Sequence, residues 1–81
     1  MDAKQLKKIS EQFSLHQIEA CIKRQAEQGE NECGVVDDTT DEALTALSKA
    51  EVVRELMDKG MTFTEALREL GKRIRAIYGK D

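Results

Sequence analysis

At 81 residues, the chain has room for one domain, 1–81, and no second hydrophobic core. A formal net charge of −3 argues against a general nucleic-acid-binding protein, and no stretch approaches the roughly 18 consecutive apolar residues of a membrane-spanning helix. The absence of proline and the low glycine count of 5 are typical of a compact helical domain.

Apolar periodicity predicts an all-α fold of four to five helices, with a helical hairpin in the C-terminal half. The predicted helices cover about 3–12, 15–28, 41–47, 49–59 and 63–78. We expect the core to contain Leu6, Ile9, Phe13, Ile18, Ile22, Leu44, Leu47, Val53, Leu56, Phe63, Leu67, Leu70 and Ile74. With only three aromatic residues in the chain this core is thin, and burial within a homodimer is one remedy.

Local signals set the ends of the second predicted helix. Ser14 and Gln17 have the spacing of a capping box, in which each side chain bonds the backbone N–H of the other residue. Gly29 follows the last turn, and glycine adopts the left-handed backbone of a helix end without a steric penalty. We therefore expect this helix to begin after Ser14 and to end at Gly29.

The segment that follows is the least helical part of the chain and the most one-sided in charge. Its charges sum to −6 and come from Glu30, Glu32, Asp37, Asp38, Asp41 and Glu42, with no base among them. A calcium-binding loop has acids at alternate positions, glycine sixth and glutamate twelfth, and the segment lacks that spacing. We predict that its first four acids form part of a partner-binding surface.

Two further capping signals divide the next stretch. Thr39 and Glu42 can cap a short helix, and Ser48 with Glu51 has the spacing of another capping box. We expect the chain to break at Ser48, with a helix on either side. A single helix that runs straight through Ser48 is the alternative.

The C-terminal half is organised around Gly60. This glycine is predicted to end one helix, and a capping box of Thr62 and Glu65 begins the next almost at once. The following helix carries the most regular apolar stripe of the chain: Phe63, Ala66, Leu67, Leu70, Ile74, Ile77 and Tyr78. The stripe needs another surface to cover it. Gly71 at its edge is read as a site of close packing against another backbone.

Neither metal binding nor catalysis finds support in the residue types. Cys21, Cys33 and His16 are too few and too widely spaced for a zinc site, so no metal or other cofactor is expected. We expect Cys21 to be a small core residue, Cys33 to be exposed, and both to remain thiols. No phosphate-binding loop or catalytic pattern occurs, which predicts a non-enzymatic protein. The N-terminal residues lack an apolar run typical of a signal peptide, so we expect a cytoplasmic location.

The remaining hypotheses are two kinds of binding module. A protein-interaction or regulatory module fits the separation of an acidic segment from a basic C-terminal helix, whose partner-binding residues we expect to be Arg68, Lys72, Arg73 and Arg75. A nucleic-acid-binding module is the alternative, because the segment GMTFTEALRELG resembles the opening of a helix-turn-helix. Leu67 and Lys72 depart from that family's pattern. A continuous helix through Gly71 explains the apolar stripe better.

Overall fold

A computed structural model describes residues 3–35 and 39–78 of the chain. Within them the elements are α1 (Ala3–Gln12), α2 (Leu15–Gln28), α3 (Thr40–Asp58) and α4 (Phe63–Tyr78). The described residues form four helices and no strand, which confirms the predicted all-α class.

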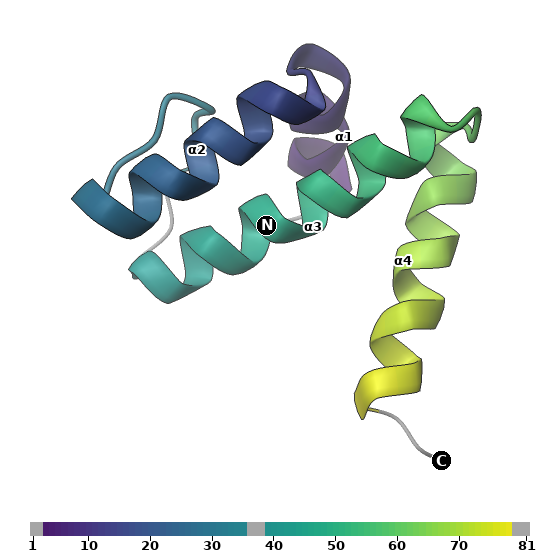
Figure 1. The fold of residues 1–81 in the computed structure, drawn as a ribbon. Helices are drawn as coiled ribbons and strands as arrows, with labels where there is room; N and C mark the ends of the chain where they lie inside the picture. Colours follow the sequence, from purple (N-terminus) through teal and green to yellow (C-terminus); the bar gives the residue numbers. More distant parts are fainter. Residues whose placement is uncertain (1–2, 36–38, 79–81) are drawn as a thin grey trace.

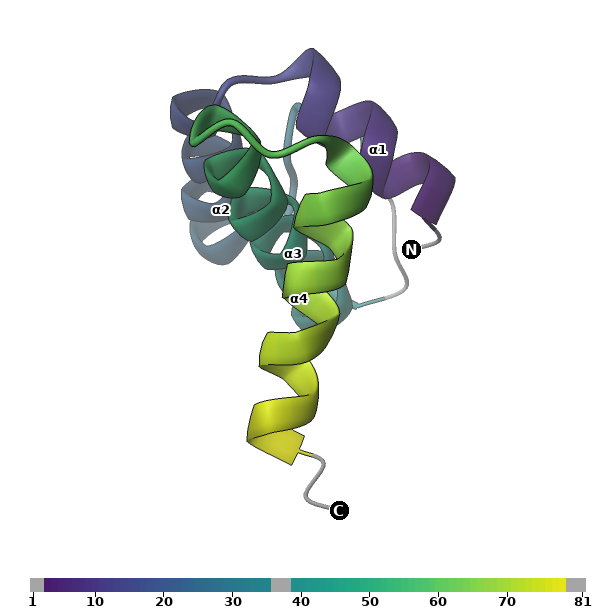
Figure 2. The same cartoon turned by 90° about the vertical axis from the view of Figure 1, so that its right-hand side faces the viewer.

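Helix α3 is the central element of the fold. It contacts α1, α2 and α4, and Figure 2 shows α1 and α2 on either side of it with α4 in front. Figure 1 shows α4 turning steeply away from the end of α3. In both views the C-terminal turns of α4 project beyond the other helices. Only the first half of α4 therefore lies over the body of the protein.

The core forms where α3 meets its neighbours. Seven of the predicted core residues are buried: Leu6, Ile9, Ile18, Leu47, Val53, Leu56 and Leu70. The other six are only partly buried: Phe13, Ile22, Leu44, Phe63, Leu67 and Ile74. The space between them is filled by side chains outside the predicted core list, namely Cys21, Cys33, Val35, Ala43, Ala46, Ala50 and Ala66. Small alanines let the helices approach closely, which partly offsets the lack of large aromatic residues.

The predicted break at Ser48 is wrong, because α3 is one helix from Thr40 to Asp58. Leu47 and Ala50 on either side of Ser48 are completely buried, so a break would separate two adjoining parts of one apolar face. Ser48 itself is exposed, where a serine is tolerated in a helix at little cost. Continuous burial thus outweighs the local capping signal.

The predicted caps of α2 and α4 are confirmed. The Ser14 hydroxyl accepts from the Gln17 N–H at 3.1 Å, and the Gln17 side chain accepts from the Ser14 N–H at 2.8 Å. Thr62 and Glu65 make the same reciprocal pair at 2.9 and 3.1 Å. Gly29 ends α2 in the left-handed conformation, with φ of 76°.

Gly60 ends α3 as predicted. Its φ is 108°, a value that side chains other than hydrogen rarely allow. The Gly60 N–H donates to the Met57 carbonyl at 3.0 Å, and the Met61 N–H donates to the Leu56 carbonyl at 3.2 Å. These two bonds form a Schellman motif, which satisfies carbonyls left open at the helix end.

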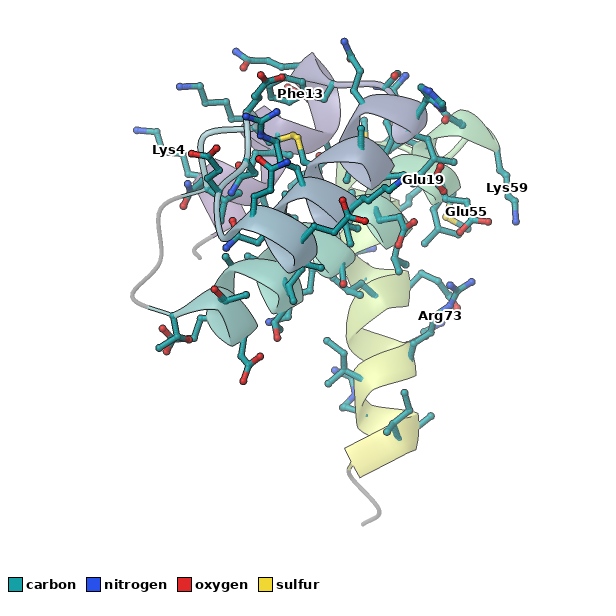
Figure 3. All side chains as sticks on the ribbon, turned by 60° about the vertical axis from the view of Figure 1, so that its left-hand side comes forward. Lys4, Phe13, Glu19, Glu55, Lys59 and Arg73 are labelled. Atoms are coloured by element: carbon teal, nitrogen blue, oxygen red, sulfur yellow. A yellow bond between two sulfur atoms is a disulfide. The ribbon has the colours of Figure 1, made fainter. Side chains whose placement is uncertain are left out.

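The cysteines do not remain thiols, as the sequence had led us to expect. Cys21 and Cys33 form a disulfide, with their Cα atoms 6.2 Å apart, and Figure 3 shows the sulfur–sulfur bond close to Phe13. The expected exposure of Cys33 is also wrong, since only 6% of it is exposed. The cause is the turn at Gly29, which brings the following loop back over α2.

Asn31 organises this loop from within. Its side-chain oxygen accepts from the N–H groups of Cys33 and Val35 at 3.0 and 3.2 Å. Its side-chain nitrogen donates to the buried Gln25 side chain at 2.8 Å and to the Val35 carbonyl at 3.0 Å. The loop is therefore attached to α2 by a disulfide and a polar network, while Val35 enters the core.

Candidate functional site

The apolar stripe of α4 is only half covered by the rest of the protein. Ala66 and Leu70, in the first half of the helix, are buried against the core. Ile74 is partly buried, and Ile77, one turn further on, is 71% exposed. Exposure therefore rises along the stripe as α4 moves away from α3 (Figure 1).

An open groove of about 620 Å³ lies between α3 and this part of α4. The wall from α4 is formed by Leu70, Ile74 and Ile77. The wall from α3 is formed by Asp41, Leu44, Thr45, Ser48, Lys49 and Val52, which recur at helical spacing along one face. The groove is thus apolar on its α4 wall and mixed on its α3 wall, where Asp41 and Lys49 supply one charge of each sign.

A smaller hollow of about 350 Å³ lies on the other flank of α4, toward α1. Leu70, Ile74 and Lys49 border both hollows. Leu70 and Ile74 therefore form a ridge with open space on either side. At the edge of the smaller hollow, a side chain at Gly71 would meet only the Arg75 guanidinium, at 3.5 Å. The predicted close packing of another backbone at Gly71 is therefore wrong.

The four predicted basic residues are all exposed on α4. Arg68, Lys72 and Arg75 are spaced by four and three residues, so they form a row on the side of the helix opposite the apolar stripe. Arg73 lies nearer the stripe and pairs with Glu69 at 3.6 Å; Figure 3 shows it pointing away from the helix body. The structure therefore places the basic row outside the groove.

The predicted acidic residues do not join the basic ones. Glu30 pairs with Arg24 of α2 at 3.1 Å, and Glu32 is exposed beside a hollow of about 330 Å³ that Cys21 also lines. Asp37 and Asp38 lie outside the described residues. The loop and α4 stand at opposite sides of the molecule (Figure 1). Glu30 and Glu32 therefore lie apart from the basic residues of α4.

A group of acids lies where α2 faces α3. Burial raises the pKa of the Glu51 carboxyl, helped by a hydrogen bond to Glu19 and by the charges of Glu19 and Glu55. Figure 3 shows Glu19 and Glu55 on the same side of the molecule, with Glu55 close to Lys59, which it pairs with at 3.8 Å. Among the described residues, no group of three or more histidine, cysteine or acidic side chains is arranged to hold a metal ion.

The sequence predicted the residues of the α4 stripe but not the groove beside it. Leu44 was expected in the core, yet it lines the groove with Val52. The signal that could have indicated this is the mixed face of α3, where polar residues such as Thr45 and Lys49 alternate with these apolar ones. A face of that composition borders solvent rather than a closed core.

Comparison of the chain with protein-family models, with curated proteins and with solved structures finds no match. No helix within the described residues is long and apolar enough to cross a membrane.

Proposed function

We propose that the chain is a non-enzymatic protein-interaction module whose α3–α4 groove receives an amphipathic helix. The observation that carries this proposal is the 71% exposure of Ile77 on a stripe whose Ala66 and Leu70 are buried in the core. Complete burial of such a side chain is worth about 1.5–3 kcal/mol, so a partner that covers it gains affinity.

The shape of the groove supports a helix as its occupant. Its walls are two helices: the apolar residues on α4 are spaced by four and three positions, and Leu44 and Val52 on α3 lie about two turns apart. An amphipathic helix presents apolar residues at the same intervals and is bound in this way by many grooves. The predicted helical hairpin belongs to this proposal, since α3, the short turn and α4 form the groove together. The predicted regulatory role would be exerted through the bound helix.

The compartment of the protein determines which partners it can meet. A cytoplasmic location remains a prediction from the sequence. The Cys21–Cys33 disulfide favours an oxidising compartment instead. Partner searches should therefore include extracytoplasmic fractions.

The test is photo-crosslinking in the cells that make the protein. A photo-crosslinking amino acid replaces Ile77 in one variant and Met61 in a control, because Met61 is an exposed apolar residue in the turn before α4. We expect position 77 to crosslink to one protein, at a site that maps to an amphipathic helix. Equal crosslinking from both positions, or no defined product from position 77, would contradict the proposal.

A nucleic-acid-binding module is the second candidate. The observation in its favour is the exposed row of Arg68, Lys72 and Arg75, which could contact successive phosphates. Because α4 continues through Gly71, the turn of a helix-turn-helix is not present there. The test is retention on a DNA column. A steep loss of retention with salt, abolished by reversing these three charges, would support this candidate, and salt-independent passage through the column would contradict it.

A further inference from the structure

We infer that the helix bound by the groove is α4 of a second copy of the chain, in a two-fold symmetric dimer. This inference rests on the proposed function and identifies the occupant. Each chain carries both an incompletely covered helix and the groove beside it. In a two-fold contact each chain can therefore supply its helix to the partner and receive the partner's helix in return.

The apolar residues on the two sides of this contact match in kind. Ile74 and Ile77 are the side chains that α4 has left to bury, while Leu44 and Val52 are the ones that the groove of α3 leaves accessible. When the C-terminal turns of each α4 pack into the groove of the other chain, these four side chains are covered in both chains. The additional burial of apolar side chains would add to the small core expected for so short a chain.

Charge is also complementary across the proposed contact. The first turn of α3 carries Asp41 and Glu42, both exposed, and Asp41 lines the groove. Arg73 lies four residues before Ile77 and so shares its side of α4, which brings it near Asp41 of the partner when Ile77 enters the groove. Within the described residues, Arg73 pairs with Glu69, and the Arg73 side chain in this pair is 48% exposed.

The basic row of α4 does not oppose this arrangement. Arg68 and Lys72 lie on the side of α4 opposite the apolar stripe, so they face solvent when the stripe is buried. Two copies of α4 can then approach without bringing these like charges together. A partner with a strongly acidic helix would instead bind the basic row, whose residues lie outside the groove.

The first measurement is the concentration dependence of the solution mass of the full chain by analytical ultracentrifugation. We expect a dimer, and we expect Ile77→Glu to raise its dissociation constant by about a hundredfold or more, because each dimer loses two buried apolar side chains. Met61→Glu is the matched control and should leave the dissociation constant unchanged. Circular dichroism checks that both variants keep their helices.

The second measurement identifies the contact. In a mixture of isotope-labelled and unlabelled chains, nuclear Overhauser effects between chains should connect the Ile77 methyl groups with those of Leu44 and Val52. A chain that stays monomeric at millimolar concentration, or a dimer with contacts elsewhere, would overturn the inference. The proposed function would survive that result if position 77 crosslinks to an amphipathic helix of a different protein, and it would fall as well if no crosslink forms.

Discussion

The two segments that flank α3 in the chain differ in how much of them the rest of the protein holds in place. Beside the beginning of α3, the loop after α2 is fixed by the Cys21–Cys33 disulfide and by four hydrogen bonds to the Asn31 side chain. Beside its end, α4 departs steeply and leaves Ile77 exposed (Figure 1). The chain itself holds the irregular loop in place, whereas the exposed half of α4 is the surface that we propose a partner covers.

The loop before α3 and the exposed part of α4 should affect different properties, the first stability and the second binding. Changes at the loop should lower the free energy of unfolding without altering the groove, because the loop and α4 lie at opposite sides of the molecule (Figure 1). Changes to Ile77 should alter association without altering the fold.

Replacing Cys21 and Cys33 together by alanine should lower the free energy of unfolding by about 3 kcal/mol. The disulfide closes a loop between residues 12 apart in sequence, and removing it increases the entropy of the unfolded chain. Urea unfolding measures the change, and reduction of the native disulfide should have a comparable effect. An unaltered midpoint would mean that the disulfide does not stabilise the loop.

Asn31→Ala should cost about 2 kcal/mol, because the N–H groups of Cys33 and Val35 lose their acceptor and the buried Gln25 side chain loses its donor. The neighbouring exposed residue provides the control, and Glu32→Ala should change stability by less than about 0.5 kcal/mol. Both are compared by urea unfolding. Equal effects from the two substitutions would show that the network contributes no more than the surface does.

Gly60→Val should cost about 1–2 kcal/mol, since a β-branched residue resists the left-handed backbone at this position. Gly71→Ala is the matched control in a helix interior. It should raise stability by up to about 1 kcal/mol, because alanine is the better helix former and only the flexible Arg75 side chain lies nearby. Thermal unfolding should move in opposite directions for the two variants, and a shift of the same sign in both would contradict the explanation.

Glu51→Gln should have the smallest effect, a gain of less than about 1 kcal/mol at neutral pH. The pKa of Glu51 is raised in the folded protein, so the folded state keeps its proton to a higher pH than the unfolded chain does. The associated stability is complete below the unfolded pKa and is lost as pH rises through the folded pKa. Urea unfolding from pH 4 to 8 should therefore show a smaller decline for the variant, and a steeper decline would contradict the assignment.

The sequence predicted features whose cause is local. The capping boxes at Ser14 and Thr62 and the helix end at Gly60 depend on residues a few positions apart, and all three are confirmed. The break at Ser48 failed because burial of Leu47 and Ala50 involves other helices. A local capping signal carries no information about such distant contacts.

The sequence predicted less of the candidate site than of the helices. The stripe that ends in Ile77 was predicted as a face that needs cover, but how much of it α3 covers depends on the angle between α3 and α4, which no single motif encodes. The disulfide was missed for a similar reason, since Cys21 and Cys33 meet only because the loop turns back over α2 after Gly29. The charge runs predicted an acidic segment apart from a basic helix, and whether either binds a partner remains a prediction.

The α3–α4 groove is open in the isolated chain, and we propose that a bound helix closes it. The most direct test follows methyl signals by nuclear magnetic resonance while a soluble nitroxide broadens those near solvent. At low protein concentration, the signals of Ile77 and Val52 should broaden, while that of the fully buried Ile18 should not. As concentration rises and the second copy binds, Ile77 and Val52 should become protected. Continued broadening of both at every concentration, with no protection by any crosslinked partner, would contradict the claim.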